Sequence, residues 1–244
     1  VIPVFHKNQS LAFSLIGGAS GEGDIIERLQ FIITITNIIA VAIENKRLFK
    51  QQVERELLKQ EMNLAMSMQK KLMPSHFPCR ENIRFHGFYK PKLDVGGDYF
   101  DIIEHSEEEI IFTIADISGK GVAAALLMSN IQAILRTLVK RNIGLSEILK
   151  ELDETISEMM EGDKFASMFV AKYNQKKKLL SYVNAGHNPP LIHYLNQEKP
   201  SELLEATSSV LGSMSSYDSI KEHDVHISDP AILIMYTDGL TEIM

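Results

Sequence analysis

The chain has 244 residues, of which 45% are hydrophobic and 23% charged, a composition typical of a globular protein with room for more than one domain. Its formal net charge is −7, which argues against a sequence-independent nucleic-acid-binding protein, because such proteins need a basic surface. There is one cysteine, Cys79, which excludes an intramolecular disulfide and a thiolate metal cluster.

The first part of the chain indicates two strands within residues 1–23, followed by a flexible glycine-rich loop. Asp24 is a suitable N-cap for a helix that continues without Pro or Gly to Met73 and ends before Pro74. The most apolar stretch, Leu29–Ile43, is short and contains four polar residues, so we expect no membrane segment in this chain.

The second half of this helix predicts a coiled-coil linker over residues 47–74. Apolar residues follow a heptad pattern in which a polar residue, Gln69, fills one core position. The heptad seam consists of Leu48, Leu58, Met62, Ala65 and Leu72. This pattern predicts a homodimer, and the alternative is a single long surface helix.

A second domain is expected from residue 75 onward. The patterns predict strands over 83–91, 96–103, 107–116, 165–173, 179–186, 191–195 and 231–239. Between the early and late strands lie two helices, one over 122–141, closed by Asn142 and Gly144, and one capped by Ser146. This order predicts an α+β layered domain with largely antiparallel sheets.

Three carboxylates lie at the edges of apolar runs in this domain: Asp98, Asp116 and Asp238. The run before Asp238 is apolar enough to predict a fully buried strand. An isolated buried carboxylate costs several kcal/mol unless it is paired or coordinated, and no Arg or Lys lies beside these residues on their strands. Converging carboxylates of this kind would bind Mg²⁺ or Mn²⁺. The alternative is that each aspartate only forms a turn.

Glycines accompany each aspartate. Gly97, Gly119 and Gly239 lack side chains, so a metal ion or a phosphate could approach the backbone there, and we expect them to contribute to substrate binding. The segment "SGKG" (residues 118–121) lacks the spacing of a nucleotide-binding phosphate loop, which argues against a kinase.

From about Asn63 to the C-terminus the chain resembles the SpoIIE/RsbU-like branch of the PPM metal-dependent serine/threonine protein phosphatases. The motifs that carry the resemblance include "DVGGDYFDI", "ADISGKGVAAALLMS", "YVNAGHNPPLI" and "YTDGLTE". The resemblance implies an α-β-β-α sandwich over residues 75–244 and a centre of two Mn²⁺ or Mg²⁺ ions between the sheets.

The resemblance also implies roles for individual residues. Asp116 would bridge both ions, and the backbone carbonyl of Ile117 would add a ligand. Asp98 would hold one ion and Asp238 the other, which makes these three aspartates the catalytic residues. The family usually has a further aspartate in a later strand, so we expect a phosphatase domain that is incomplete at its C-terminus. For His187, a structural role in its turn is favoured over proton donation.

Residues 1–46 are similar to the last part of a GAF sensory domain, an α/β fold, through the motif "VAIENKRLFKQQ" on its closing helix. The long helix would join it to the phosphatase domain. The expected function is that of a cytoplasmic bacterial signalling phosphatase in a stress response, acting on a phosphorylated STAS-type anti-sigma-factor antagonist. The alternative is a phosphatase fold used as a non-catalytic regulatory or dimerisation module.

Overall fold

The structure, a computed structural model, describes residues 2–6, 9–14, 25–91, 96–119, 121–160, 164–196, 199–213 and 220–241. The chain forms two compact units, Val1–Glu61 and Met62–Met244. The division falls inside the long helix α1 (Ile25–Leu72), so the last turns of this helix belong to the second unit.

The first unit contains an antiparallel hairpin of β1 (Ile2–His6) and β2 (Gln9–Ser14), followed by most of α1. The strand pair and the long helix that the sequence predicts are therefore present, while the proposed cap at Asp24 lies outside the described residues. By length and apolar composition alone, α1 and a second helix, Val122–Val139, would each be long enough to cross a membrane.

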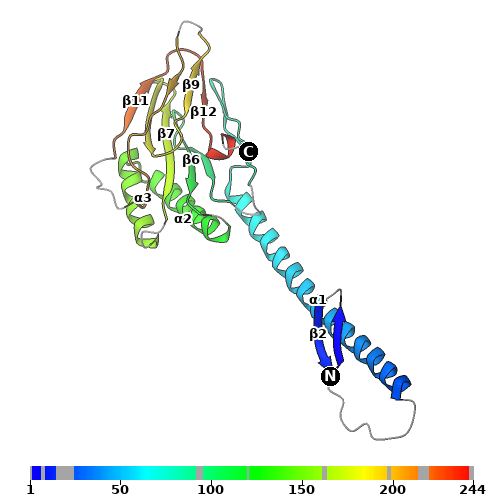
Figure 1. Ribbon diagram of the computed structural model, residues 1–244. Helices are drawn as coiled ribbons and strands as arrows, with labels where there is room; N and C mark the ends of the chain where they lie inside the picture. Colours follow the sequence, from blue (N-terminus) through cyan, green and yellow to red (C-terminus); the bar gives the residue numbers. More distant parts are fainter. Residues whose placement is uncertain are drawn as a thin grey trace. The chain divides into compact units, whose positions relative to one another are not determined.

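Two larger antiparallel sheets contain most of the strands described in the second unit (Figure 1). One has the order β11-β8-β7-β6-β5 and the other the order β10-β9-β12. The strands of the first are β5 (Tyr99–Glu104), β6 (Glu109–Ile117), β7 (Ala166–Asn174), β8 (Leu179–Ala185) and β11 (His223–His226). Those of the second are β9 (Leu191–Tyr194), β10 (Glu202–Leu203) and β12 (Ala231–Ile234).

Two apolar cores hold these layers together. The helices α2 (Val122–Val139) and α3 (Leu145–Met160) pack on one face of the five-stranded sheet, where Met128, Leu135 and Leu152 are fully buried. The opposite face of that sheet packs on the three-stranded sheet through residues such as Phe169 and Ile192. The α+β class is confirmed, with one helical layer and two sheets; within the described ranges no helix forms the second outer layer of the expected sandwich.

The start of α3 differs from the sequence prediction. The helix begins at Leu145, one residue before the expected cap Ser146. The side chain of Glu222 caps it from outside, because its Oε2 accepts a hydrogen bond from the Leu145 amide at 3.2 Å. Asn142 takes a φ of 57°, as expected for a residue that ends a helix in the left-handed conformation.

Two strand predictions need correction. The strand expected over 83–91 is present only as β4 (Ile83–Arg84), which forms a small hairpin with β3 (Cys79–Arg80). The strand expected to be fully buried before Asp238 is β12, where Ile232 is 49% and Ile234 43% exposed. The reason is that only one face of β12, which carries Ala231 and Leu233, packs on the core, while Ile232 and Ile234 lie on the opposite face.

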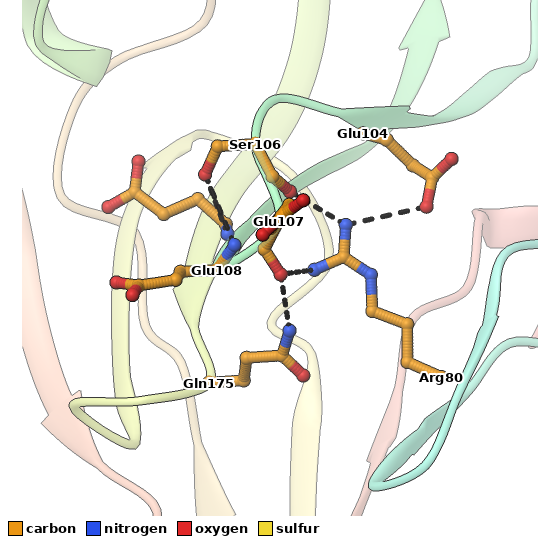
Figure 2. Close-up of polar contacts among 7 residues, drawn as sticks. Arg80, Glu104, Ser106, Glu107, Glu108 and Gln175 are labelled. Carbon is orange, nitrogen blue, oxygen red and sulfur yellow. Dashed lines mark hydrogen bonds and ion pairs between the residues drawn. The ribbon is translucent and has the colours of Figure 1, made fainter.

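The β3–β4 hairpin is attached to the turn between β5 and β6 by Arg80 (Figure 2). Its guanidinium donates to the backbone oxygens of Glu107 at 2.6 Å and Ser106 at 2.8 Å. Gln175, in the neighbouring β7–β8 turn, donates to the same Glu107 oxygen at 2.6 Å. Backbone oxygens of one turn thus accept hydrogen bonds from side chains of β3 and of the β7–β8 turn, which stabilises this end of the sheet.

Candidate metal centre

The register of β5 and β6 brings Asp98 and Asp116 together. Tyr99 pairs with Ala115. Asp98, which precedes Tyr99, therefore lies beside Asp116, which follows Ala115. Side chains alternate along a strand, and the neighbours of Asp116 at even positions, such as Ile114, face the space between the two sheets. A side-chain interaction with Asp116 lowers the pKa of Asp98, so the two carboxyl groups lie close together at this end of the sheet.

Asp238 reaches the same region from the other sheet. After β12 the chain runs through Thr237, whose hydroxyl donates to the Asp98 carboxylate at 3.2 Å. Asp238 then begins a short 3-10 helix, Asp238–Leu240, and its side chain is exposed. Its charge acts on Asp98. Asp116 and Asp238 therefore both act on the carboxyl group of Asp98.

The electrostatics of the site centre on Asp98. Burial raises the pKa of its carboxyl above the usual value, and the negative charge of Asp238 raises it further, while hydrogen bonds with Thr237 and Asp116 act in the opposite direction. Burial and the charge of Asp98 also raise the pKa of Tyr89 to about 12. A half-buried carboxylate beside two others, with no cationic side chain among these influences, favours a bound cation.

The donors present fit Mg²⁺ or Mn²⁺ in their chemistry. Both ions prefer carboxylate and carbonyl oxygens and retain several waters, so a few protein oxygens suffice. Asp98, Asp116 and the carbonyl of Ile117 supply such oxygens at the ends of β5 and β6. In the part of the chain that the structure describes, however, no three acidic, His or Cys side chains lie close enough together to form a complete ligand group by themselves.

The glycines differ in their surroundings. Gly97 packs directly on β6, because a Cβ added to it would lie 2.4 Å from the backbone oxygen of Ile117. This contact keeps the Gly97 loop against the carbonyl that the sequence predicts as a ligand. Gly119 has a φ of +105°, which disfavours other residues, and an added Cβ would meet nothing within 4 Å. Gly239 is also open, with only the Thr237 hydroxyl within 4 Å.

His187 is part of a buried turn near the site. Its side chain is 3% exposed, its Nδ1 shares a hydrogen bond with Ser167 at 2.8 Å, and its amide donates to the Asn184 side chain. Burial lowers the pKa of His187 to about 4, although the backbone of Tyr236 and the charge of Asp238 raise it. Its Nε2 has no hydrogen-bond partner of ordinary geometry among the described residues. The imidazole is therefore neutral at neutral pH, which fits the structural role expected from the sequence.

The heptad seam residues have two kinds of surroundings in this single chain. Leu48 and Leu58 are exposed, at 48% and 60%. Leu72 packs against the core of the second unit, and Gln69 is 5% exposed.

Sequence reasoning overlooked Gln69, Tyr89 and Thr237 as neighbours of the candidate site. Gln69 donates a hydrogen bond to the Gly96 backbone. The charge of Asp98 raises the pKa of Tyr89, and the Thr237 hydroxyl donates a hydrogen bond to the Asp98 carboxylate. The only available signal was the polar residue at an apolar heptad position, which indicates an unusual environment at Gln69 without naming its partner.

Comparison with known proteins agrees with this arrangement. The profile of the family described as Stage II sporulation protein E (SpoIIE) matches residues 106–244, more than half of the chain. The phosphoserine phosphatase RsbU of Bacillus subtilis (strain 168) is 30% identical over 219 residues, which cover 90% of this chain and 64% of RsbU. The chain thus spans just under two thirds of that relative.

Solved structures show the same fold. The RsbU and RsbW domains of Rv1364c from Mycobacterium tuberculosis align with a TM-score of 0.55 and 27% identity, over 63% of this chain and 42% of that one. RsbX in complex with magnesium aligns with a TM-score of 0.50 and 19% identity, over 60% of this chain and 68% of that one. The residues that the family profile matches include β6, the helices α2 and α3, and the strands from β7 to β12. The chain therefore belongs to the SpoIIE family.

Proposed function

We propose that this chain is a metal-dependent phosphoserine/phosphothreonine protein phosphatase. The observation that supports the proposal is that Asp116, Asp238 and the Thr237 hydroxyl all act on the Asp98 carboxyl group. Membership in the SpoIIE family and the similarity to the phosphoserine phosphatase RsbU support the assignment of this chemistry.

The residues that would hold two Mn²⁺ or Mg²⁺ ions are Asp98, Asp116, Asp238 and the carbonyl of Ile117. Bound there, such ions supply an activated water and neutralise charge on the phosphoryl oxygens. RsbX, which shares the fold, was solved in complex with magnesium, which is consistent with a divalent ion as cofactor. Gly97 holds its loop against Ile117, and the open surroundings of Gly119 and Gly239 leave room for a phosphorylated side chain.

The protein's own groups limit the possible proton donors. His187 is neutral at neutral pH because burial lowers its pKa to about 4, so it has no proton to give as an imidazolium. We infer that water delivers the proton to the leaving serine or threonine oxygen.

We further propose the biological setting from the family resemblance. The substrate is a phosphorylated STAS-type anti-sigma-factor antagonist in a bacterial stress response, and the protein is cytoplasmic. Residues 1–46 form the end of a GAF-like sensor, residues 47–74 a dimerising linker, and residues 75–244 the phosphatase domain. The helix α2 follows the turn after Asp116 directly, so a linker movement that shifts α2 would move this ligand.

The test is hydrolysis of a phosphoserine peptide with and without Mn²⁺, comparing the wild type with Asp116→Asn. We expect metal-dependent turnover that falls roughly a hundredfold or more in the variant, because a group that stabilises the transition-state charge is lost. Asp224→Asn is the matched control, since Asp224 lies on β11, is exposed, and accepts a hydrogen bond from Ser181 that Asn also accepts. Equal activity of Asp116→Asn and the wild type would refute the proposal.

A second candidate is a phosphatase fold used as a non-catalytic regulatory or dimerisation module. It is favoured by the lack of a complete three-side-chain ligand group among the described residues and by the exposure of Asp238. Calorimetric titration with Mn²⁺ separates the two candidates, because only the phosphatase requires a saturable site that Asp116→Asn removes.

A further inference from the structure

The register of the five-stranded sheet places a serine beside each of two aspartates. Asp116 on β6 lies directly opposite Ser167 on β7. Asp224 on β11 lies directly opposite Ser181 on β8. Residues that face each other in an antiparallel pair have Cβ atoms about 4.5–5.5 Å apart on the same face of the sheet. In both pairs the serine hydroxyl is therefore within reach of the carboxylate.

The two serines use their hydroxyl groups differently. Ser181 donates to the carboxylate of Asp224 at 2.5 Å. The Ser167 hydroxyl instead shares a hydrogen bond with Nδ1 of His187 at 2.8 Å. A serine hydroxyl carries a single proton, so a hydroxyl that donates it to one acceptor has none left for another. What separates the two pairs is therefore the imidazole beside Ser167.

The turn that contains His187 presents Nδ1 of the ring to Ser167. His187 is 3% exposed, its amide donates to the Asn184 side chain at 2.8 Å, and Asn184 donates to the Leu204 carbonyl at 2.9 Å. A neutral imidazole has one N–H and one bare nitrogen. The backbone of Tyr236 raises the pKa of His187, which is the effect of an acceptor near a ring N–H. Because Nδ1 faces Ser167, this N–H is on Nε2, and Nδ1 accepts the Ser167 proton.

The direction of the Ser167 proton matters for the charge of Asp116. A hydroxyl that donates to a carboxylate makes a charge-assisted hydrogen bond, which has to be broken before a cation can bind the same oxygen. With its proton given to His187, Ser167 turns only oxygen lone pairs toward the carboxylate beside it. Lone pairs do not compete with a cation for the oxygens of Asp116.

We propose that Ser167 and His187 are a pair of positioning residues that keep the Asp116 carboxylate available for a divalent cation. His187 accepts the Ser167 proton and thereby prevents a serine–aspartate hydrogen bond of the kind that Ser181 makes. The role toward Mn²⁺ or Mg²⁺ rests on the proposed function, because it assumes that Asp116 is a ligand. The neutral, buried imidazole thus serves the metal centre without binding an ion or transferring a proton to the substrate.

The first test is calorimetric titration of the whole chain with Mn²⁺. His187→Leu removes the acceptor, so Ser167 can donate to Asp116, and we expect the Mn²⁺ Kd to rise about tenfold. Ser167→Ala should keep the wild-type Kd, because no hydroxyl is left to compete. The double variant Ser167→Ala/His187→Leu should therefore regain the wild-type Kd. Ser181→Ala, the same change in the other serine–aspartate pair, is the matched control and should also bind Mn²⁺ as the wild type does.

A purely structural role of His187 predicts a different pattern. If the substitution acted by disturbing the turn, Mn²⁺ binding would weaken equally in His187→Leu and in the double variant. That result, or an unchanged Kd in His187→Leu, would overturn the proposal.

The second test needs no metal and no variant of His187. Nitrogen-15 NMR of the imidazole in the metal-free wild type should show a bare Nδ1 and a protonated Nε2, and a protonated Nδ1 would overturn the proposal. A wild type that binds no Mn²⁺ would refute the metal centre itself, while the NMR measurement would still decide whether Ser167 donates to His187.

Discussion

At the scale of single residues, the second unit shows two ways of keeping an ionisable group inside a protein. Asp101 is 0% exposed, and Arg136 donates hydrogen bonds to both of its oxygens. Asp98 has no such partner among the groups that act on it most strongly, and burial raises its pKa. The difference separates a structural carboxylate from one suited to a cation, although both lie within four residues of each other in sequence.

His187 provides a test at this scale. Its pKa of about 4 in the folded protein is below the unfolded value of 6.5, so between these pH values the unfolded state binds more protons. The contribution of His187 to the free energy of unfolding should therefore fall by roughly 3 kcal/mol as the pH drops from about 6.5 to about 4. Below about pH 4 this contribution should not change further.

We expect the His187→Gln substitution to remove this pH-dependent contribution to stability. The free energy of unfolding of the variant should therefore change less between about pH 6.5 and pH 4 than that of the wild type. Urea denaturation of the metal-free protein at several pH values measures the difference. Parallel curves for the two proteins would show that His187 is not buried in the neutral form.

At the scale of elements, β5 and α2 are joined by the pair of Asp101 and Arg136. The guanidinium donates at 2.7 and 2.8 Å, and Asp101 also accepts from the Tyr99 hydroxyl at 2.9 Å and from the Ile102 amide at 2.9 Å. The pair therefore ties the last turn of α2 to β5.

Arg136→Met should therefore be strongly destabilising. It leaves the fully buried Asp101 without its cation, and we expect a loss of about 3 kcal/mol in the free energy of unfolding. The control is Arg141→Met, since Arg141 pairs with Glu151 where both side chains are partly exposed, and the expected loss is less than about 1 kcal/mol. Urea denaturation measures both, and similar losses in the two variants would contradict this account.

At the scale of the whole molecule, the proposed dimer and its regulation depend on α1. Leu57 and Leu58 are both exposed, at 56% and 60%, but only Leu58 belongs to the heptad seam. The apolar exposure of this helix is large for a single chain, and a second copy would cover it. The seam cannot be continuous to its end, because Leu72 and Gln69 contact the chain's own second unit.

Leu58→Lys should weaken dimerisation at least about tenfold, because it places a charge in the seam. Leu57→Lys, the same change one position away, should have a smaller effect. Sedimentation measures the association, and turnover of a phosphoserine peptide shows whether it is coupled to activity. Unchanged turnover with a disrupted dimer would argue against regulation through the linker.

Much of the secondary structure could be predicted from sequence. The helix-period patterns of α1 and α2, the hairpin turn between β7 and β8, and the antiparallel order of the sheets are all present. Local patterns suffice there because the period of the apolar residues and the turn residues act within a few positions. The start of α3 was missed because its cap comes from Glu222, a residue far along the chain.

The sequence by itself determined which residues were candidates for the metal centre, since a carboxylate at the end of an apolar run is visible without coordinates. Only the tertiary structure decided that Asp116 and Asp238 both act on Asp98, that β12 is half exposed, and that Gln69 donates a hydrogen bond to Gly96 instead of facing a second helix. The physical reason is that periodicity reports whether a face is buried, whereas the partner that buries it depends on how segments distant in the chain pack together.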